Sequence, residues 1–429
     1  MKFAADNVGW RARFAALFLC ALLSACAGHD RYATHHLAVG SDGGFSAERL
    51  AALTRMVQGD MDAKRIPGAV ILISRNGSVV YAQVLGARDP KTNAPMAENA
   101  IFRIYSMTKP IVSVGAMMLM EDGKLALGEP VSQYLAELKD LKVGVEKIGA
   151  DGKPTLELVP AKQEMTVQDL LRHTSGLIYE YEELFGKSLV RSAYLKSGVN
   201  NKDIISNDDL VKKLANLPLA HQPGTTWEYS RSTDVLGALI ERISGKTLDL
   251  YLGERILKPL RMEDTGFWAE PTKQDRLAEA FEIDPDSKQP TDLRNVRSRP
   301  TFLSGGAGMV STARDYLRFA QMLLNGGELD DVRILSRKTV EYMTADHLNG
   351  ITGLDSLGSG FGLGFLVRTA TGMARVPGSV GDYTWGGYAG TVFWVDPRER
   401  LVAICMMQAP GEQLRYLRLY RNMVYAAME

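Results

Sequence analysis

The chain has 429 residues, of which 45% are hydrophobic and 23% are charged, and its 50 Lys and Arg residues balance its 50 Asp and Glu residues. This length allows a large buried core, and the neutral balance gives no electrostatic reason to bind nucleic acid. We therefore expect two closely packed lobes that act on a small molecule, with no nucleic-acid partner and no cofactor.

The N-terminal 25 residues have the pattern of an export signal. Basic residues precede an apolar stretch, 14–25, that is too short to span a bilayer. The sequence Leu23-Ser24-Ala25-Cys26 resembles the lipobox of bacterial lipoproteins, in which cleavage leaves the cysteine as a lipid-modified N-terminus. We expect a signal peptide over 1–25, lipidation at Cys26 and a flexible tether over 26–44. The protein would then be a cell-envelope lipoprotein, held by its lipid at the periplasmic face of a bacterial membrane. An ordinary signal peptide with an incidental cysteine is the alternative.

The cysteines exclude a disulfide framework once the signal is removed. Cys20 leaves with the signal and Cys26 is acylated, so Cys405 keeps no partner within the chain. Because Cys405 lies in an apolar run, 401–405, we expect it to be a small buried hydrophobic residue.

Hydrophobic periodicity separates strand-rich chain ends from a mostly helical middle. In chain order the predicted elements are a helix over 45–63, strands over 68–74 and 78–86, a short extended run over 101–105, an apolar helix through 111–120, helices over 166–173, 207–216, 234–243, 249–256 and 315–324, strands over 363–367, 384–388, 390–395 and 401–408, and a final helix over 413–428. The first two strands are joined by Asn76-Gly77, a dipeptide typical of tight hairpins. The segment 284–299 reads only as a charged surface loop.

The stretch Tyr105-Ser106-Met107-Thr108-Lys109-Pro110 combines a hydroxyl with a potential base. Ser106 and Lys109 are three residues apart, so a helix that starts at Ser106 places both side chains on one face. A serine alcohol becomes a nucleophile when a neighbouring base takes its proton, and a helix N-terminus favours a developing oxyanion. Taken alone, the motif favours the simpler interpretation that Ser106 only caps a buried helix.

Two further stretches offer partners for Ser106. Tyr229 lies in a loop immediately before a predicted helix, from which its phenol can project into a cleft between the lobes. The strand that contains Trp385-Gly386-Gly387-Tyr388 has two glycines, which allow a ligand or another backbone to approach closely and to meet an amide N–H.

These motifs together resemble the serine β-lactamase and penicillin-binding-protein family, and most closely the family VIII carboxylesterases. The resemblance runs from Phe45 to Met428, and the segments 171–177 and 305–312 also look like structural signatures of the family. It implies an α/β (α+β) fold of the β-lactamase/transpeptidase type over 45–429. In such a fold an antiparallel sheet flanked by helices forms one lobe, about 45–115 and 301–429, beside a mostly helical lobe, about 116–300.

The resemblance also implies a role for each site residue. Ser106 is the expected nucleophile, Lys109 its general base, and Tyr229 the residue that passes the proton to the leaving group. The backbone amides of Ser106 and Tyr388 are expected to form the oxyanion hole. The substrate pocket is expected to include Tyr105, Arg231, Trp385, Gly386 and Gly387.

The chain departs from class C β-lactamases at two places. Those enzymes have an asparagine where this chain has Arg231, and Lys-Thr-Gly where it has Trp385-Gly386-Gly387. Trp385 supplies an apolar wall and no charge, which favours neutral acyl substrates. Arg231 either replaces the missing cation, points to solvent or pairs with an acid.

These observations predict a serine hydrolase that cleaves carboxylic esters through an acyl-Ser106 intermediate. A β-lactamase or D,D-peptidase, an acyltransferase and a non-enzymatic envelope protein that binds muropeptide-like ligands are the alternatives. A Gly-x-Ser-x-Gly elbow is absent from the sequence, and its six histidines show no metal-ligand spacing, so neither an α/β-hydrolase triad nor a metal site is expected.

Overall fold

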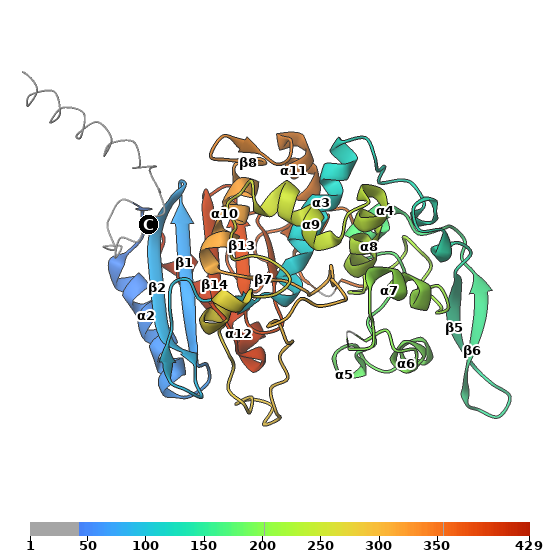
Figure 1. The fold of residues 1–429 in the computed structure, drawn as a ribbon, viewed down its shortest axis with the longest axis horizontal. Coiled ribbons are helices and arrows are strands. Elements are labelled where there is room, and N and C mark those ends of the chain that lie inside the picture. Colours follow the sequence, from blue (N-terminus) through green and yellow to red (C-terminus); the bar gives the residue numbers. More distant parts are fainter. Residues whose placement is uncertain (1–42, 201, 355) are drawn as a thin grey trace, which may run out of the picture. The chain divides into compact units, whose positions relative to one another are not determined.

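An eight-stranded antiparallel sheet forms the centre of one lobe (Figure 1). Its strands, in spatial order, are β10 (Ser359–Phe361), β11 (Leu366–Arg368), β12 (Tyr383–Gly386), β13 (Val392–Asp396), β14 (Leu401–Met407), β1 (Gly68–Arg75), β2 (Ser78–Asp89) and β3 (Ala94–Pro95). The computed structural model describes residues 43–200, 202–354 and 356–429. The strands come from both ends of the chain, as the sequence predicts, and β1 pairs with β14 along its length.

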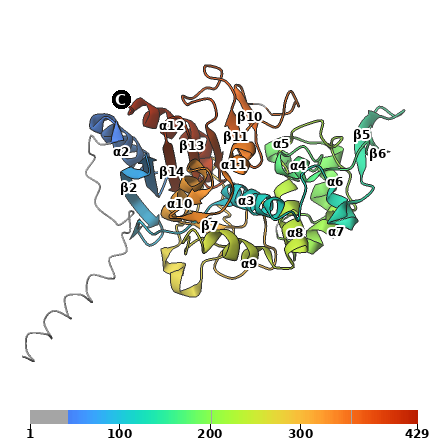
Figure 2. The ribbon, with the colours of Figure 1, turned by 90° about the horizontal axis from the view of Figure 1, so that it is seen from above.

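Helices cover both faces of this sheet (Figures 1 and 2). α2 (Ala47–Asp62) and α12 (Gln413–Ala426) pack together on one face, and α10 (Ala313–Leu324) packs on the other. The two central strands are therefore buried on both sides, and every residue of β14 is buried. This explains why β1 and β14 read in the sequence as continuous apolar runs rather than as alternating ones. Cys405 lies in β14 and is fully buried, which confirms its prediction as a small core residue.

Helix α3 (Thr108–Glu121) runs through the interior, and all of its residues from Thr108 to Leu119 are buried. A 3₁₀ turn, Tyr105–Met107, leads into it from the short strand β4 (Phe102–Arg103), which pairs with β7 (Val310–Ser311). α3 thus begins two residues later than the sequence predicts, and Ser106 lies in the turn that precedes it.

The middle of the chain is mostly helical. Its helices are α4 (Val167–Leu171), α5 (Glu182–Phe185), α6 (Leu189–Lys196), α7 (Asn207–Leu214), α8 (Ser232–Ser244) and α9 (Leu248–Leu252), which continues as a π-helical turn, Gly253–Leu257. Short 3₁₀ turns in this part span Val131–Gln133, Ala136–Leu138 and Pro271–Arg276. In the C-terminal part, α11 (Arg337–Met343) follows the hairpin of β8 (Glu328–Leu329) and β9 (Val332–Arg333), and a further 3₁₀ turn spans Pro410–Glu412.

A hairpin of β5 (Lys142–Ile148) and β6 (Pro154–Pro160) interrupts the helical middle, and the sequence prediction did not include it. The hairpin extends from the helical lobe (Figure 1), and most of its side chains are exposed. It therefore lacks the apolar face by which strands are recognised in a sequence. The sequence features that could have predicted the hairpin are the β-branched residues within both strands and the turn-forming dipeptide Asp151-Gly152.

The architecture confirms the predicted α+β fold with a large antiparallel sheet. The predicted signal peptide, Cys26 and most of the tether lie outside the described residues. The last two residues of the predicted tether are held in place, because the Arg75 guanidinium donates to the carbonyls of Gly43 and Gly44.

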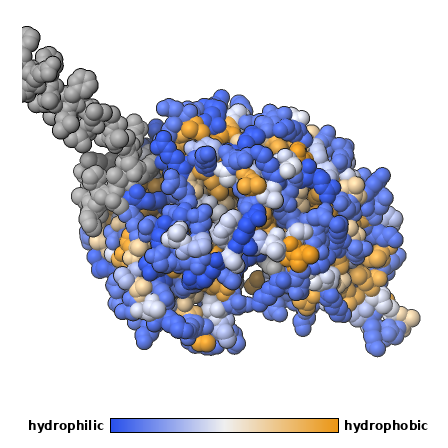
Figure 3. Space-filling view, in the orientation of Figure 1, coloured by the Kyte–Doolittle hydropathy of each residue, from blue (hydrophilic) through white to orange (hydrophobic). Residues whose placement is uncertain are grey.

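Polar side chains cover most of the face shown in Figure 3, and apolar ones are scattered among them. Within the described ranges, the structure has no helix with the length and apolar character needed to cross a bilayer.

Candidate active site

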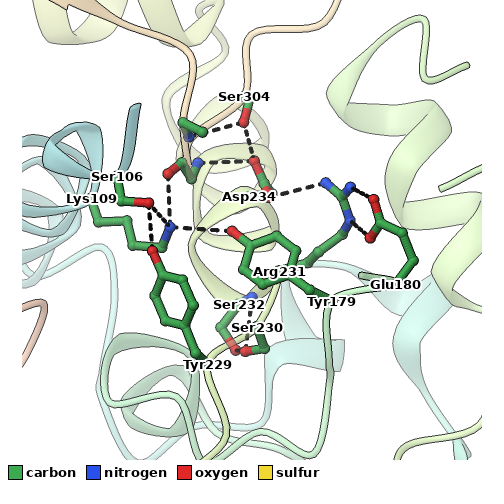
Figure 4. Close-up of polar contacts among 12 residues, drawn as sticks. Ser106, Lys109, Tyr179, Glu180, Tyr229, Ser230, Arg231, Ser232, Asp234 and Ser304 are labelled. Atoms are coloured by element: carbon green, nitrogen blue, oxygen red, sulfur yellow. Dashed lines mark hydrogen bonds and ion pairs between the residues drawn. The ribbon is translucent and has the colours of Figure 1, made fainter. Parts of the chain in front are cut away.

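Ser106 lies at the junction of β4 and α3, with its hydroxyl directed toward Lys109 (Figure 4). Tyr105, just before it, has a φ of 42°, a left-handed conformation that is uncommon for a residue with a side chain. Contacts on both sides hold this conformation: the Tyr105 hydroxyl accepts from the Arg294 amide, and its ring meets Tyr388 edge-on at 5.4 Å. The Ser106 hydroxyl makes no capping bond to the helix backbone, so the helix-cap interpretation of this serine is wrong.

The Ser106 oxygen contacts both predicted partners. Lys109 Nζ is 3.3 Å from Ser106 Oγ, and the Tyr229 hydroxyl donates to the same oxygen at 2.6 Å. Lys109 Nζ also lies 4.4 Å from the centre of the Tyr229 ring. Residues 123 positions apart therefore converge on one oxygen, and this oxygen has a neighbouring group able to take its proton and another able to return one.

Lys109 is only 1% exposed, and acceptors surround its amine. Besides Ser106 Oγ, it donates to the Tyr179 hydroxyl at 3.2 Å and to the Gly306 carbonyl at 2.8 Å. An ammonium has three donors, so these three acceptors match it. The neutral amine would keep two N–H bonds, to Tyr179 and Gly306, and would direct its lone pair toward Ser106. This is the arrangement that a general base requires.

Tyr179 and Gly306 are site residues that the sequence did not reveal. Burial and the charge of Asp234 raise the pKa of Tyr179 well above its usual value, so its hydroxyl stays protonated beside the amine. Gly306 has no room for a side chain, because a Cβ there would lie 2.8 Å from Asp234 Oδ2 and 2.9 Å from the Tyr179 hydroxyl. The glycine-rich segment 305–308 thus allows the Gly306 carbonyl to reach Lys109. That segment is the one signal in the sequence that pointed here.

The prediction that Arg231 lines the substrate pocket is wrong. Arg231 is 0% exposed, and its guanidinium forms a two-pronged ion pair with Glu180, at 3.1 and 2.6 Å (Figure 4). It also contacts Asp234 at 3.4 Å. A cation enclosed by two carboxylates cannot face a substrate, so Arg231 is not the replacement cation that the sequence left open.

Arg231 instead belongs to a buried network that supports Lys109. Asp234 Oδ1 accepts from the Ser304 hydroxyl at 2.5 Å and from the Gly306 amide at 2.9 Å. The chain of contacts therefore runs from Arg231 through Asp234 to the peptide segment whose carbonyl holds Lys109. Removing one member of such a buried ion pair typically costs ~3–5 kcal/mol.

His173 supports the ring of Tyr229 and has no contact with Ser106. The two rings are 5.0 Å apart, and His173 Nδ1 is 3.1 Å from the Ser230 hydroxyl. Burial and the nearby Lys109 charge lower the pKa of His173 well below its usual value, so the imidazole is neutral at pH 7. Ser175 bonds to Ser232, 2.8 Å away. The structure thus assigns both residues to the turn that follows α4.

Aromatic side chains enclose the Tyr229 phenol. Trp385 and Tyr179 each lie 5.4 Å from its ring, Phe185 lies at 6.2 Å and Trp227 at 6.4 Å. Trp385 thus packs beside the Tyr229 ring and brings no charge to it. This surrounding favours an apolar acyl or alkoxy group next to Ser106.

The end of β12 lies against the Ser106 turn. A Cβ at Gly387 would lie 2.3 Å from the Ile104 carbonyl, so only glycine permits this approach. A Cβ at Gly386 would lie 3.4 Å from its nearest neighbour, the Thr391 carbonyl, so the space there requires glycine less strictly. Neither the Ser106 amide nor the Tyr388 amide donates a hydrogen bond to any described residue. Both donors are therefore available to an oxyanion, and the Tyr388 side chain, 48% exposed, lies at the surface.

The fold and this site together define a serine hydrolase. The chain belongs to the Beta-lactamase family, because the model of that family matches residues 53–427. It is 34% identical over 359 residues to Protein Rv1367c of Mycobacterium tuberculosis (strain H37Rv), an alignment that covers 81% of this chain and 87% of that protein.

Two further relatives carry an activity in their names. The chain is 31% identical over 370 residues to Esterase EstB of Burkholderia gladioli, covering 82% of this chain and 88% of that one. Among solved structures it is similar to EstCE1, described as a hydrolase with promiscuous acyltransferase activity. That match has a TM-score of 0.73 and 26% identity and covers 88% of this chain and 99% of the other. The family membership expected from the sequence is thus confirmed.

Proposed function

We propose that this protein hydrolyses carboxylic esters of neutral acyl groups through an acyl-Ser106 intermediate. The observation that carries the proposal is the Ser106 oxygen bonded to both Lys109 and Tyr229, beside Trp385 instead of a cation. The esterase among the relatives supports the same substrate class.

In the proposed reaction, Lys109 and Tyr229 move protons both when the acyl-enzyme forms and when it is hydrolysed. Neutral Lys109 takes the Ser106 proton while Oγ bonds to the ester carbonyl carbon, and the amides of Ser106 and Tyr388 stabilise the resulting oxyanion. Tyr229 then gives its proton to the departing alkoxide and regains one from Lys109. In the second half a water molecule attacks the acyl-Ser106 carbonyl and gives up its proton by the same route, which restores the serine.

An acyltransferase is the second candidate, because EstCE1 is described as having promiscuous acyltransferase activity. The acyl-enzyme would be the same, but an alcohol or amine would take the acyl group in place of water. A β-lactamase or D,D-peptidase would also use Ser106. Such an enzyme would have to bind its substrate carboxylate without a cation at position 385.

The test is a side-by-side assay of a short-chain aryl ester and a cephalosporin, each with and without added alcohol. We expect kcat/KM for the ester to exceed that for the cephalosporin by about 10–100-fold, the worth of one missing charged hydrogen bond. We also expect free acid to remain the main product when alcohol is added. Faster cephalosporin turnover would overturn the ester assignment, and diversion of most product to the new ester would establish the acyltransferase.

We also propose that the protein is an exported lipoprotein anchored through Cys26, on the basis of Leu23-Ser24-Ala25-Cys26. Cys26→Ala is expected to abolish palmitate incorporation and to leave an unprocessed precursor. Cys20→Ala, a matched change inside the predicted signal, should leave labelling intact. Absence of palmitate from the unaltered chain would refute the anchor.

A further inference from the structure

A cavity of about 300 Å³ lies between α12 and the sheet edge formed by β10, β11 and β12. Thr384 of β12 lines it, and Thr384 pairs across the sheet with Trp394, which packs on Tyr420 of α12. Directly paired residues share one face of a sheet, so the cavity is on the α12 face. Trp385, the next residue of β12, points to the opposite face, where it contacts Tyr229. The cavity is therefore separate from the site around Ser106.

The charged residues that line this cavity are mostly arginines. They are Arg368, Arg375, Arg418 and Arg421, with Asp382 as the acid. Four cations against one anion leave a formal charge of +3 around the cavity. Such a concentration of one sign attracts an anion of matching charge.

Two of these arginines are buried and share a single carboxylate. Arg368 and Arg421 are 5% and 4% exposed, and both donate to Oδ2 of Asp382, Arg368 Nε at 2.6 Å. Asp396, at the end of β13, is a second buried carboxylate, and it accepts from the Tyr425 hydroxyl and from two backbone amides. Among the described residues it forms no ion pair with Arg368 or Arg421. The carbonyls of Val376 and Pro377 also accept from these two guanidinium groups but supply no negative charge, so one buried positive charge is left without a carboxylate.

The two buried arginines differ in their remaining donors: Arg368 uses all three guanidinium nitrogens, on Asp382 and on the carbonyls of Val376 and Pro377, whereas Arg421 uses two. Arg421 donates through Nε and Nη2, while its Nη1 has no acceptor among the described residues. The Trp394 ring, 5.4 Å from the guanidinium carbon, fixes the plane of this group. Arg375 and Arg418 are exposed and form no ion pair or side-chain hydrogen bond within the described ranges. Arg421, Arg375 and Arg418 therefore keep donors that no described residue uses, and of these only Arg421 is held in place by its contacts.

We propose that this cavity binds phosphate, either free or as the monoester of a small molecule or lipid headgroup. A phosphate monoester carries about −1.5 to −2 charge at pH 7, closer to the surplus of the cavity than a single carboxylate is. Guanidinium groups bind phosphate oxygens through paired N–H donors. The volume is at the lower end of small-molecule sites, ~300–1,000 Å³, so it accommodates a small substituent on the phosphate. The bound group bridges α12 to β11 and stabilises the fold.

The test measures binding and thermal unfolding of the full-length chain in a phosphate-free buffer. Inorganic phosphate and glycerol 3-phosphate are titrated by calorimetry against sodium chloride of equal ionic strength, and Tm is followed in parallel. We expect saturable binding and a rise in Tm with phosphate but not with chloride. Arg418→Gln and Arg375→Gln should each raise Kd by about tenfold, because each removes one charged hydrogen bond at an exposed rim.

Arg55→Gln is the matched control, since Arg55 is an exposed arginine on α2 with no ion pair among the described residues. Equal weakening by Arg55→Gln would reduce the effect to net charge and overturn the site, as would the absence of saturable binding to every phosphate tested. Vesicles of phosphatidylcholine with and without phosphatidic acid form the second arm. Arginine-dependent binding to the phosphatidic acid vesicles alone would assign the phosphate to a lipid headgroup. The assay does not use turnover, so its result is independent of the proposed ester hydrolysis.

Discussion

Ser106→Ala is expected to lower ester turnover by about 10⁴-fold or more while leaving the fold intact. The substitution removes the oxygen to which both Lys109 and Tyr229 are bonded, and the hydroxyl makes no backbone contact that supports α3. Steady-state kinetics measures the loss of turnover, and intact-mass detection of the acyl adduct measures the loss of the covalent intermediate.

Ser113→Ala provides the control on the same helix. Ser113 is a buried serine of α3 that loses the same atom, but its hydroxyl is bonded neither to Lys109 Nζ nor to the Tyr229 hydroxyl in the described structure. We expect its adduct formation to match that of the unaltered chain. Persistent labelling of Ser106→Ala by a phosphonate would place the nucleophile elsewhere.

Lys109→Met and Tyr229→Phe are each expected to reduce kcat/KM by at least ~10²–10⁴-fold, the usual worth of a general acid or base. Lys109→Met keeps the length of the side chain but leaves Ser106 without its base. Tyr229→Phe keeps the ring and its contacts with Trp385 but deletes the hydroxyl. Because both groups act on the same proton of Ser106, the double variant should lose far less than the product of the two single losses.

The leaving group separates the two roles. A loss in Tyr229→Phe that is confined to an alkyl ester would make Tyr229 the general acid alone, with Lys109 as the base. Near-normal rates for both alkyl and activated aryl esters would make Tyr229 only a wall of the pocket. Tyr181→Phe is the matched control, because Tyr181 stacks on Tyr179 and its hydroxyl has no hydrogen bond in the described part of the chain.

Apart from Tyr229, which the family resemblance supplied, the features that the sequence predicted well are fixed by local patterns. Ser106 and Lys109 are three residues apart, so any helical path brings them together. The strands β1 and β14 were predicted because burial on both faces leaves a continuous apolar run. Gly387 was recognised as a point of close approach because a strand glycine often has that role.

The residues that the sequence missed depend on distant parts of the chain. Tyr179 and Gly306 contact Lys109 across 70 and 197 positions, and no local pattern distinguishes that tyrosine from others. Arg231 was misassigned because its environment is decided by Glu180, 51 residues earlier. The local sequence around an arginine that follows a loop tyrosine is the same whether its side chain faces a substrate or a buried acid.

The pairing of β1 with β14 also governs how the enzyme matures. Strand β1 pairs with a strand more than 300 residues later in the chain, as the pairing of Ile71 with Cys405 shows. A nascent chain that ends before Leu401 already contains Ser106, Lys109 and Tyr229, but it lacks the strand that joins β13 to β1 and so positions β12. Contacts of such long range form slowly, because their loop must close before it is stabilised. The sheet that positions β12 is therefore completed only when the chain has been made through β14.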